Sequence, residues 1–453
     1  MAHETFLIFN PTPMQRRSFI KKSSFTALSI GVLGSIHWNG SAIAADKTLK
    51  VNGQRIESRI LELAKFGRDD DGHGYRVAYT KGDIEGRAWF MDLMMKAGLE
   101  VTIDAGGNII GKRKGKNQSL KPIAFGSHID MVPDGGNYDG TLGSISALEV
   151  IEVLNENNIT TEHPLEVIIF GNEEGGTIGS KALAGLLTAE GLKNKSQSGL
   201  TMAEGIKAIG GNPDNIQSVI RKKGDIHAFL ELHIEQGGIL ENENLQIGVV
   251  EGIVGMMDWD VTVEGFANHA GSTPMNMRKD ALIAASRLVI AVNEVINSVP
   301  GKQVGTVGKI ASLPGASNVI PGKVTLSLEI RDLAIEKVEM LFAEIQKRAA
   351  TIATDSKTTI SFQPQFTIRP ALSDKRLQEK INTSAKSLGF TTRFMQSGAI
   401  HDSQNMSLIA PMAMIFVPSV GGISHSPKEF TKTVDMTNGA NVLFQTILNV
   451  DKG

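Results

Sequence analysis

Apolar positions in the first third of the chain alternate between a helical repeat and short buried runs. Asp83–Ala97 has helical spacing and predicts a helix with Asp83 as its N-cap. A second helix is predicted over Thr141–Asn155. The runs Pro122–Gly126 and Leu165–Phe170 are typical of strands buried on both faces. Strands that alternate with helices predict an α/β fold with a mainly parallel sheet.

The pattern changes after about residue 250. Trp259–Val263 and Lys323–Ile330 alternate polar and apolar residues, as strands with one exposed face do. Helices are predicted over Asp280–Val295 and Ile335–Ala353, and the apolar run Ala413–Val417 then returns to the buried type. The chain is therefore expected to leave its first domain, build a second of the α+β class, and return. The predicted ranges are 46–255 and 368–453 for the first domain and 256–367 for the inserted one.

The first 45 residues are typical of a targeting segment. Arg16 and Arg17 are followed by the apolar run Phe25–Ile36 and by small residues at Ser41–Ala45. This order predicts a twin-arginine signal, recognition by the twin-arginine export machinery, and a periplasmic protein. The alternative is a basic terminus with a chance apolar stretch. A bilayer span needs about 20 apolar residues, so no stable membrane association is expected.

Composition narrows the classes of protein. The chain has 453 residues, which is long enough for two or more domains. It has no cysteine, which excludes disulfides, thiolate metal sites and cysteine nucleophiles. The formal net charge of −2 offers no electrostatic basis for binding nucleic acid or an anionic membrane.

Six side chains suited to metal binding or acid–base chemistry lie in short glycine-rich or acidic segments. The segments are GSHIDMVPDGGNYDGTLGS, FGNEEGG, LELHIEQGG and GGISHSPKEF, and the residues are His128, Asp139, Glu173, Glu174, His233 and His425. Two divalent metals need imidazoles, terminal carboxylates and one carboxylate able to bridge. The candidates follow predicted strands, where open α/β sheets place their sites. The sequence therefore predicts a two-metal hydrolase.

Local spacing suggests roles in the first two segments. His128 is expected to bind metal while Asp130 holds its other ring nitrogen, although a surface pair is the alternative. Asp139 has two oxygens and could bridge. Adjacent Glu173 and Glu174 repel unless cations or a shared proton compensate, which favours one ligand and one general base. A helix N-terminal acidic pair is the alternative for them.

The remaining candidates have weaker local support. His233 shares one strand face with Glu231 and Glu235, and a surface strand is the alternative. His425 lies in a rigid loop before Pro427, where a plain loop histidine is the alternative.

Polar residues in and after the inserted domain could contact a substrate. Arg331 could grip a carboxylate or pair with Asp332. His269 and Asn318 lie in the same domain, and His401 lies in the polar loop SGAIHDS.

The motifs together resemble the M20-type amidohydrolases, and more narrowly the hydantoinase/carbamoylase family. The most specific are GSHIDMVPDGGNYDG, ELHIEQG, NHAGSTPM, NVIPG and SGAIHDS followed by FVPSVGGISHSPKE. The resemblance runs from Arg76 to Glu429. It implies an α/β metallohydrolase domain with a mainly parallel sheet, an inserted α+β lid and dimerisation domain, and a homodimer. It leaves open whether lid residues act within one chain or across to a partner subunit.

The resemblance also implies residue roles. One metal would be held by His128, Asp139 and His233, and the other by Asp139, Glu174 and His425. Glu173 would be the base that activates the attacking water. Substrate contacts would come from Gln236, Asn318, Arg331, His401 and His269, the last also stabilising the tetrahedral intermediate. Histidine and carboxylate ligands without thiolate suit Zn, Mn, Co or Ni.

The expected activity is hydrolysis of a linear, non-peptide C–N bond in an N-carbamoyl amino acid or ureido acid, with release of ammonia. The substrate is then a small molecule with a carboxylate. Alternatives are an allantoate or ureidoglycolate amidohydrolase, an exported aminoacylase or dipeptidase, and a periplasmic binding protein with a degenerate site. The presence of all six candidates disfavours the last. Ser317, Ile400 and Thr177–Ser180 depart from the family pattern near the pocket and bear on the choice of substrate.

Overall fold

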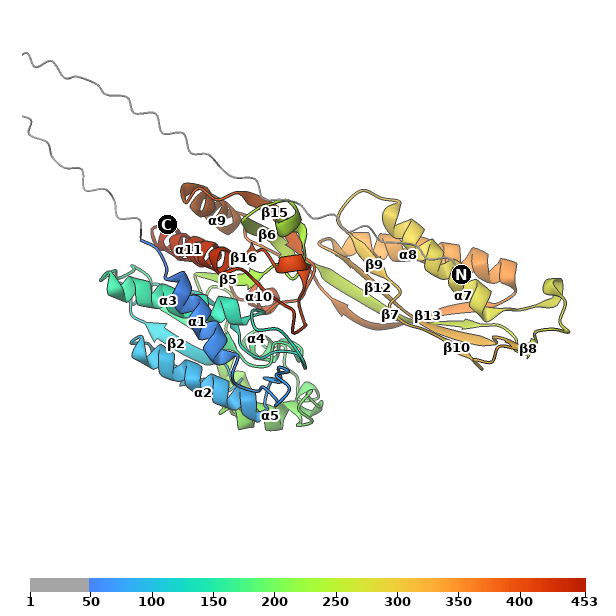
Figure 1. Ribbon diagram of the computed structural model, residues 1–453, viewed down its shortest axis with the longest axis horizontal. Coiled ribbons are helices and arrows are strands. Elements are labelled where there is room, and N and C mark those ends of the chain that lie inside the picture. The colour runs from blue at the N-terminus through green and yellow to red at the C-terminus, as the bar shows by residue number, and fades with distance from the viewer. Residues whose placement is uncertain (1–48) are drawn as a thin grey trace, which may run out of the picture. The chain divides into compact units, whose positions relative to one another are not determined.

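Two β-sheets, with a short two-stranded ribbon, organise the computed structural model, which describes residues 49–453 (Figure 1). The export signal predicted at residues 1–45 lies outside the described residues and stays a prediction. Within residues 49–453, no helix is both long enough and apolar enough to cross a bilayer.

The larger sheet has nine strands in the order β1-β2-β4-β3-β5-β16-β6-β14, with β15 beside β6. The strands are β1 (Glu100–Ile103), β2 (Ile109–Arg113), β3 (Ile123–His128), β4 (Leu165–Phe170), β5 (Ala228–Ile234), β6 (Ile247–Ile253), β14 (Ala371–Leu372), β15 (Thr392–Ser397) and β16 (Met412–Val417). The central strands β4, β3, β5 and β16 run parallel to one another. Antiparallel pairs join β1 to β2, β2 to β4, β16 to β6 and β14 to β6, while β15 runs parallel to β6. The predicted parallel sheet is therefore confirmed at the centre, with antiparallel strands at the flanks.

Helices cover both faces of this sheet, which is why its central strands are buried at every residue. Side chains of a strand alternate between faces, so Val167 and Ile169 of β4 join one core and Ile168 and Phe170 the other. The helices are α1 (Gly53–Leu63), α2 (Lys81–Lys96), α3 (Thr141–Glu156), α4 (Ile178–Leu183), α5 (Met202–Ala208), α6 (Ile239–Asn242), α9 (Lys375–Ser387), α10 (Asp402–Met406) and α11 (Thr433–Asp451). In Figure 1, α1 (blue) and α11 (red), from opposite ends of the described chain, lie side by side.

The smaller sheet has the order β10-β12-β7-β13, with β9 also paired to β12. Its elements are β7 (Gly255–Glu264), α7 (Ala281–Asn297), β9 (Val304–Thr306), β10 (Ile310–Leu313), β12 (Lys323–Asp332), α8 (Ile335–Ser356) and β13 (Thr359–Ile368). Alternate residues of β12 are buried against α7 and α8, as its sequence pattern predicts. Trp259 stacks on Phe342 of α8, with ring centroids 3.8 Å apart. A two-stranded ribbon of β8 (Asn268–His269), which is exposed, and β11 (Val319–Ile320) completes this part.

One predicted helix start is wrong. The α2 helix begins at Lys81 with Thr80 as its N-cap residue, and Asp83 lies in the first turn. The Asp83 carboxylate accepts a hydrogen bond from the backbone N–H of Tyr79 at 2.8 Å. Asp83 therefore lies within the helix, and its partner is a backbone donor that precedes the helix. The predicted domain boundaries stay predictions, because Leu49–Gly453 forms one compact unit.

Candidate metal centre

The candidate ligands meet at one edge of the larger sheet because they follow neighbouring parallel strands. His128 is the last residue of β3, and Glu173 and Glu174 follow β4. His233 is the second-last residue of β5, and His425 follows β16. Since parallel strands share one carboxyl edge, residues far apart in the sequence come together there.

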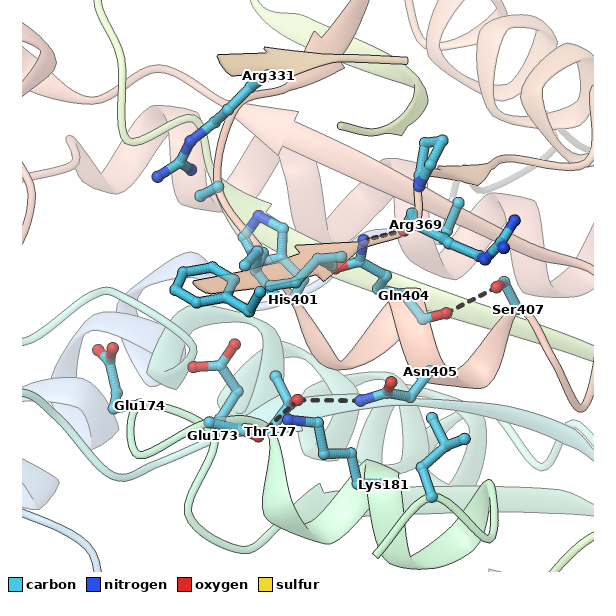
Figure 2. A pocket seen from close by; sticks show the side chains of 18 of the residues that line it. Glu173, Glu174, Thr177, Lys181, Arg331, Arg369, His401, Gln404, Asn405 and Ser407 are labelled. Carbon is cyan, nitrogen blue, oxygen red and sulfur yellow. Dashed lines mark hydrogen bonds between the residues drawn. The ribbon is translucent and has the colours of Figure 1, made fainter. Parts of the chain in front are cut away.

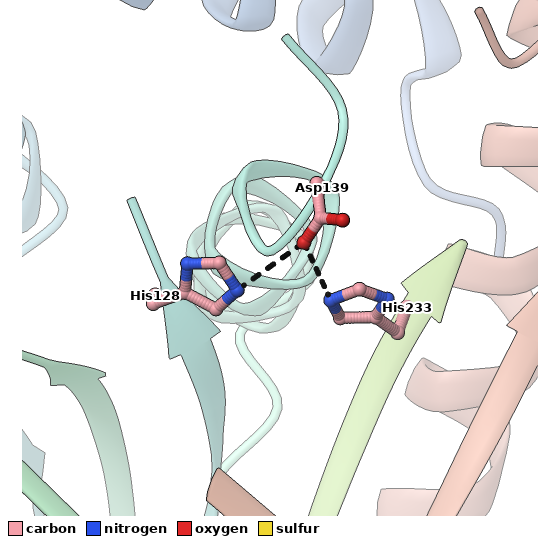
Figure 3. A group of neighbouring side chains, drawn as sticks. All are labelled: His128, Asp139 and His233. Carbon is pink, nitrogen blue, oxygen red and sulfur yellow. Dashed lines mark ion pairs between the residues drawn. The ribbon is translucent and has the colours of Figure 1, made fainter. Parts of the chain in front are cut away.

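Asp139 lies between two buried imidazole rings (Figure 3). Its Oδ1 is 3.4 Å from Nε2 of His128 and 3.3 Å from Nε2 of His233. The Nδ1 atoms face backbone carbonyls, that of Asp130 at 3.1 Å and that of Ile234 at 2.9 Å. This pairing places the ring proton on Nδ1 and makes Nε2 the atom of each ring that could bind a metal. In this structure the backbone N–H of Gly140 donates to Nε2 of His233 at 3.1 Å.

A second cluster uses the other oxygen of Asp139. Nε2 of His425 lies 3.6 Å from Asp139 Oδ2 and 3.5 Å from Glu174 Oε2. Each cluster has ligand atoms close enough together to hold one ion, and Asp139 belongs to both. The His425 side chain is half exposed, so this cluster is accessible from outside the protein.

The spacing of the donor atoms fits divalent cations. Nitrogen–oxygen separations of 3.3 to 3.6 Å are longer than ordinary hydrogen bonds, which span about 2.7–3.2 Å. Two ligands at about 2.0–2.2 Å from a tetrahedral ion lie about 3.3–3.6 Å apart. The same imidazole and carboxylate donors suit Zn, Mn, Co and Ni.

The electrostatics also fit a bound cation. Burial, and then neighbouring carboxylates including Asp402 and Asp139, raise the pKa of Glu173 and Glu174 well above the usual range. Burial would raise the pKa of Asp139 too, but His233 and His128 hold it well below its usual range. Carboxylates crowded in this way need positive charge beyond the histidines, which divalent ions would supply.

Asp130 contacts His128, as its spacing suggests, and also has a second set of partners. Its carboxylate lies 3.7 Å from Nδ1 of His128, whereas its backbone carbonyl faces that nitrogen. The two carboxylate oxygens instead accept hydrogen bonds from the backbone N–H groups of Glu173, at 3.2 Å, and Glu174, at 3.1 Å. Asp130 therefore holds the second ring nitrogen of His128, as predicted, but mainly through its backbone carbonyl. Asp130 fixes the turn that carries both glutamates, and that turn precedes α4 rather than opening a helix at the acidic pair.

The neighbours of His233 on β5 are structural. Every residue of β5 is buried, so the surface-strand alternative is wrong. Glu231 accepts hydrogen bonds from the Ser127 hydroxyl at 2.7 Å and the Ser403 hydroxyl at 2.5 Å. Glu235 accepts from the first backbone N–H groups of α6. Glu235 is thus engaged away from the two clusters that share Asp139, whereas Glu231 lies within 4.8 Å of ring nitrogens of His233 and His401.

Glu429 ties together the two loops that carry Asp139 and His425. Its Oε1 accepts hydrogen bonds from the backbone N–H groups of Tyr138 at 2.8 Å and Asp139 at 3.0 Å. Its Oε2 accepts from the Ser424 hydroxyl at 2.9 Å and the His425 N–H at 3.3 Å. Sequence reasoning assigned Glu429 no role. Its place four residues after His425 was the available signal.

We expect Glu429→Gln to weaken metal binding about 10–100-fold, as the loss of a ligand-orienting partner commonly does. Glutamine keeps the shape of the glutamate side chain. Its amide N–H₂ group, however, replaces one oxygen that accepts hydrogen bonds and would face N–H or O–H donors there. Competition with a chelating dye measures the metal affinity. Glu243→Gln, which removes a surface partner of Arg393, is the control. Unchanged affinity would assign Glu429 to loop stability alone.

A cavity of about 880 Å³ opens onto the clusters (Figure 2). The candidate residues that line it are Asp139, Glu173, Glu174, Gln236, Arg331, His401 and His425. Gln236 donates from Nε2 to Asp139 Oδ2 at 2.7 Å, and its buried Oε1 has no hydrogen-bond partner among the described residues. His401 is buried against His233, with ring centroids 4.4 Å apart, and burial followed by the charge of His233 lowers its pKa well below the usual range. The cavity therefore presents a neutral imidazole and an open amide acceptor beside the clusters.

Two predicted substrate contacts lie elsewhere. His269 is exposed on β8, opposite Val319 of β11, and Asn318 directly precedes β11. Neither lines the cavity. Lys181 and Arg369, which sequence reasoning did not select, do line it. No motif marked them, because each is a single cation in an otherwise ordinary segment.

Arg331 lines the cavity and forms an ion pair, but not with its sequence neighbour. Its Nε lies 2.7 Å from Glu329 Oε1. Asp332 pairs instead with Lys337, at 3.3 Å. The predicted alternative of an Arg331–Asp332 pair is wrong, because adjacent residues on a strand point to opposite faces.

The fold and the clusters together define a metal-dependent hydrolase of the α/β class. The chain belongs to peptidase family M20/M25/M40, whose model matches residues 124–449. It is 37% identical to the N-carbamoyl-L-amino acid amidohydrolase of Geobacillus stearothermophilus, over 89% of this chain and 100% of that protein. It is 39% identical to the ureidoglycolate hydrolase of Arabidopsis thaliana, over 92% and 89%.

Solved structures agree with this assignment. The crystal structure of a hydantoinase/carbamoylase family amidase from Burkholderia multivorans matches with a TM-score of 0.84 and 36% identity, covering 89% of this chain and 99% of that one. The narrower resemblance inferred from the sequence motifs is confirmed.

Proposed function

We propose that the chain is a two-metal amidohydrolase that cleaves a linear, non-peptide C–N bond of an N-carbamoyl amino acid or ureido acid. The observation that carries the proposal is the division of Asp139, with Oδ1 toward His128 and His233 and Oδ2 toward His425. Such a carboxylate can serve two ions at once. The names of the relatives from Geobacillus and Arabidopsis support the substrate class.

His128, His233 and Asp139 would hold one ion, and Asp139, Glu174 and His425 the other. When bound, the ions supply Lewis acidity that polarises the substrate carbonyl and acidifies water. Glu173 belongs to neither cluster, yet its Oε2 lies 3.7 Å from Nε2 of His128. It is therefore placed to take a proton from the attacking water and to deliver it to the leaving nitrogen.

The cavity wall would orient the substrate. The free Oε1 of Gln236 accepts an N–H of the ureido group, and the Arg331 guanidinium donates to the carboxylate. Breaking the terminal C–N bond by adding water releases ammonia and leaves a carbamate. The carbamate then loses carbon dioxide to give the amino acid.

A substrate panel tests this function. We expect the metal-reloaded protein to release ammonia from N-carbamoyl-L-amino acids, allantoate or ureidoglycolate, with Mn, Zn, Co or Ni supplied singly. Chelation is expected to abolish the release and metal to restore it. N-acetyl amino acids and dipeptides complete the panel. Amino acid released only from these last two classes would move the chain to an aminoacylase or dipeptidase.

We further propose that the chain acts as a homodimer, in which His269 and Asn318 reach the site of the second subunit. Both residues are exposed, His269 on β8 and Asn318 just before β11, and neither lines the cavity of its own chain, which supports this. His269 would then stabilise the oxyanion of the tetrahedral intermediate.

Mixing two inactive variants tests the exchange. A hybrid of Glu173→Gln and His269→Ala subunits contains one intact site only if His269 acts across the dimer. We expect activity to appear on mixing after dissociation and reassociation. A mixture as inactive as its parents, with hybrid dimers shown by native mass spectrometry, would place His269 in its own chain's site. A His269→Ala parent that keeps its activity would place His269 outside catalysis.

A further inference from the structure

The guanidinium of Arg331 is held on two sides before any substrate arrives. Its Nε donates to Glu329 Oε1 at 2.7 Å and its Nη2 to Glu329 Oε2 at 3.0 Å. Its Nη1 donates to the backbone carbonyl of Gly398 at 2.7 Å. An arginine has five N–H groups, so these bonds leave one on each terminal nitrogen. Figure 2 draws Arg331 across the pocket from Glu173 and Glu174.

Sheet stability does not explain Glu329. Its register partner on β7 is Asp258, and carboxylates directly opposite each other destabilise a sheet. Burial, and then the Glu329 carboxylate, raise the pKa of Asp258. Arg331 is two residues along β12 on the same face, where it can compensate this charge. A sheet position that breaks a local rule in this way is typical of a functional site.

We propose that Glu329 is a positioning residue that orients Arg331 for a single planar carboxylate of the substrate. The inference rests on the proposed function, in which Arg331 binds that carboxylate. The bidentate contact with Glu329 occupies one edge of the guanidinium and fixes its rotamer. The remaining N–H groups of the two terminal nitrogens are then left for the substrate, and less side-chain entropy is lost on binding.

The pairing also defines which anions the site accepts. The charge of Arg331 is already balanced by Glu329, so recognition depends on the directions of two N–H groups more than on attraction to a large negative charge. A carboxylate matches such a pair of donors. A doubly charged phosphonate in the same place would meet repulsion from Glu329. The favoured substrates are therefore monoanionic at this end.

Steady-state kinetics of Glu329→Ala and Glu329→Gln test the proposal. We expect KM for an N-carbamoyl-L-amino acid to rise about tenfold or more in Glu329→Ala, by analogy with the loss of other orienting partners, while kcat stays within about twofold. For the carboxamide of the same compound, kcat/KM should stay within about twofold. The double variant with Arg331→Ala should be no worse than Arg331→Ala alone. Glu251→Gln, which removes a partner of Lys302, is the matched control.

Three outcomes would overturn the proposal: equal losses on acid and carboxamide, an unchanged KM, or additive losses in the double variant. The first would assign Glu329 to the fold. Failure of the proposed function shows instead in the unmodified protein, as silence on ureido compounds. In that case the kinetics of the Glu329 variants are compared on whichever N-acetyl amino acid or dipeptide is cleaved and on the carboxamide of that compound. Calorimetric binding of the acid in a Glu173→Gln background measures the same difference without turnover.

Discussion

Replacing Glu173 with glutamine is expected to lower kcat about 10²–10⁴-fold, the usual range for losing a positioned acid–base group. Glutamine keeps the size of the side chain but cannot carry the proton from water to the leaving nitrogen. Because Glu173 belongs to neither ligand cluster, the metal content should be unchanged. Ammonia release and elemental analysis of the same preparation give the two readouts.

Glu174→Gln is the variant to compare with Glu173→Gln. It lies in the cluster with Asp139 and His425, so metal should be lost at that position together with activity. The two adjacent variants are thus expected to separate proton transfer from metal binding. A Glu173→Gln protein that retains more than a tenth of the activity, or that loses metal, would contradict the assigned roles.

Replacing Asp139 with asparagine is expected to weaken both metal positions at once. A partner that only orients a ligand is worth about 10–100-fold in metal affinity, so the shared ligand should be worth more than about 100-fold at each position. The loop should keep its place, since Glu429 accepts from the backbone N–H of Asp139 rather than from its side chain. Activity should fall below detection.

Metal analysis after dialysis against a weak chelator measures the effect. Asp134→Asn is the control, because Asp134 lies nearby but is exposed and pairs with His73. Loss of one ion with retention of the other would show that Asp139 serves a single position. That result would remove the observation on which the two-metal proposal depends.

The meeting of the candidate ligands could be predicted from the sequence, because each ligand lies at or after the end of a strand and the strands determine where these ends lie. The run Leu165–Phe170 is apolar at all positions but one, and β4 has the same bounds. The parallel order of β4, β3, β5 and β16 then brings the ligands to one edge without any further information. This explains why residues as distant in sequence as His128 and His425 could be grouped.

Partners set by backbone conformation were not predictable in this way. Two residues in the order His-x-Asp do not determine whether the side chain or the backbone carbonyl of Asp130 reaches the ring. The loop after β3 decides it. The partner of Arg331, by contrast, was predictable. Adjacent residues of a strand point to opposite faces and residues two apart share a face, which excludes Asp332 and allows Glu329.

The position of β16 has a consequence for how the chain is made. This strand, Met412–Val417, lies between β5 and β6, parallel to the first and antiparallel to the second. Until the ribosome has released it, both neighbours expose unpaired hydrogen-bonding edges in the middle of a buried sheet. Such edges attract other chains, and pairing over such a sequence distance is slow. During synthesis, this protein should therefore depend on chaperones until β16 has emerged from the ribosome.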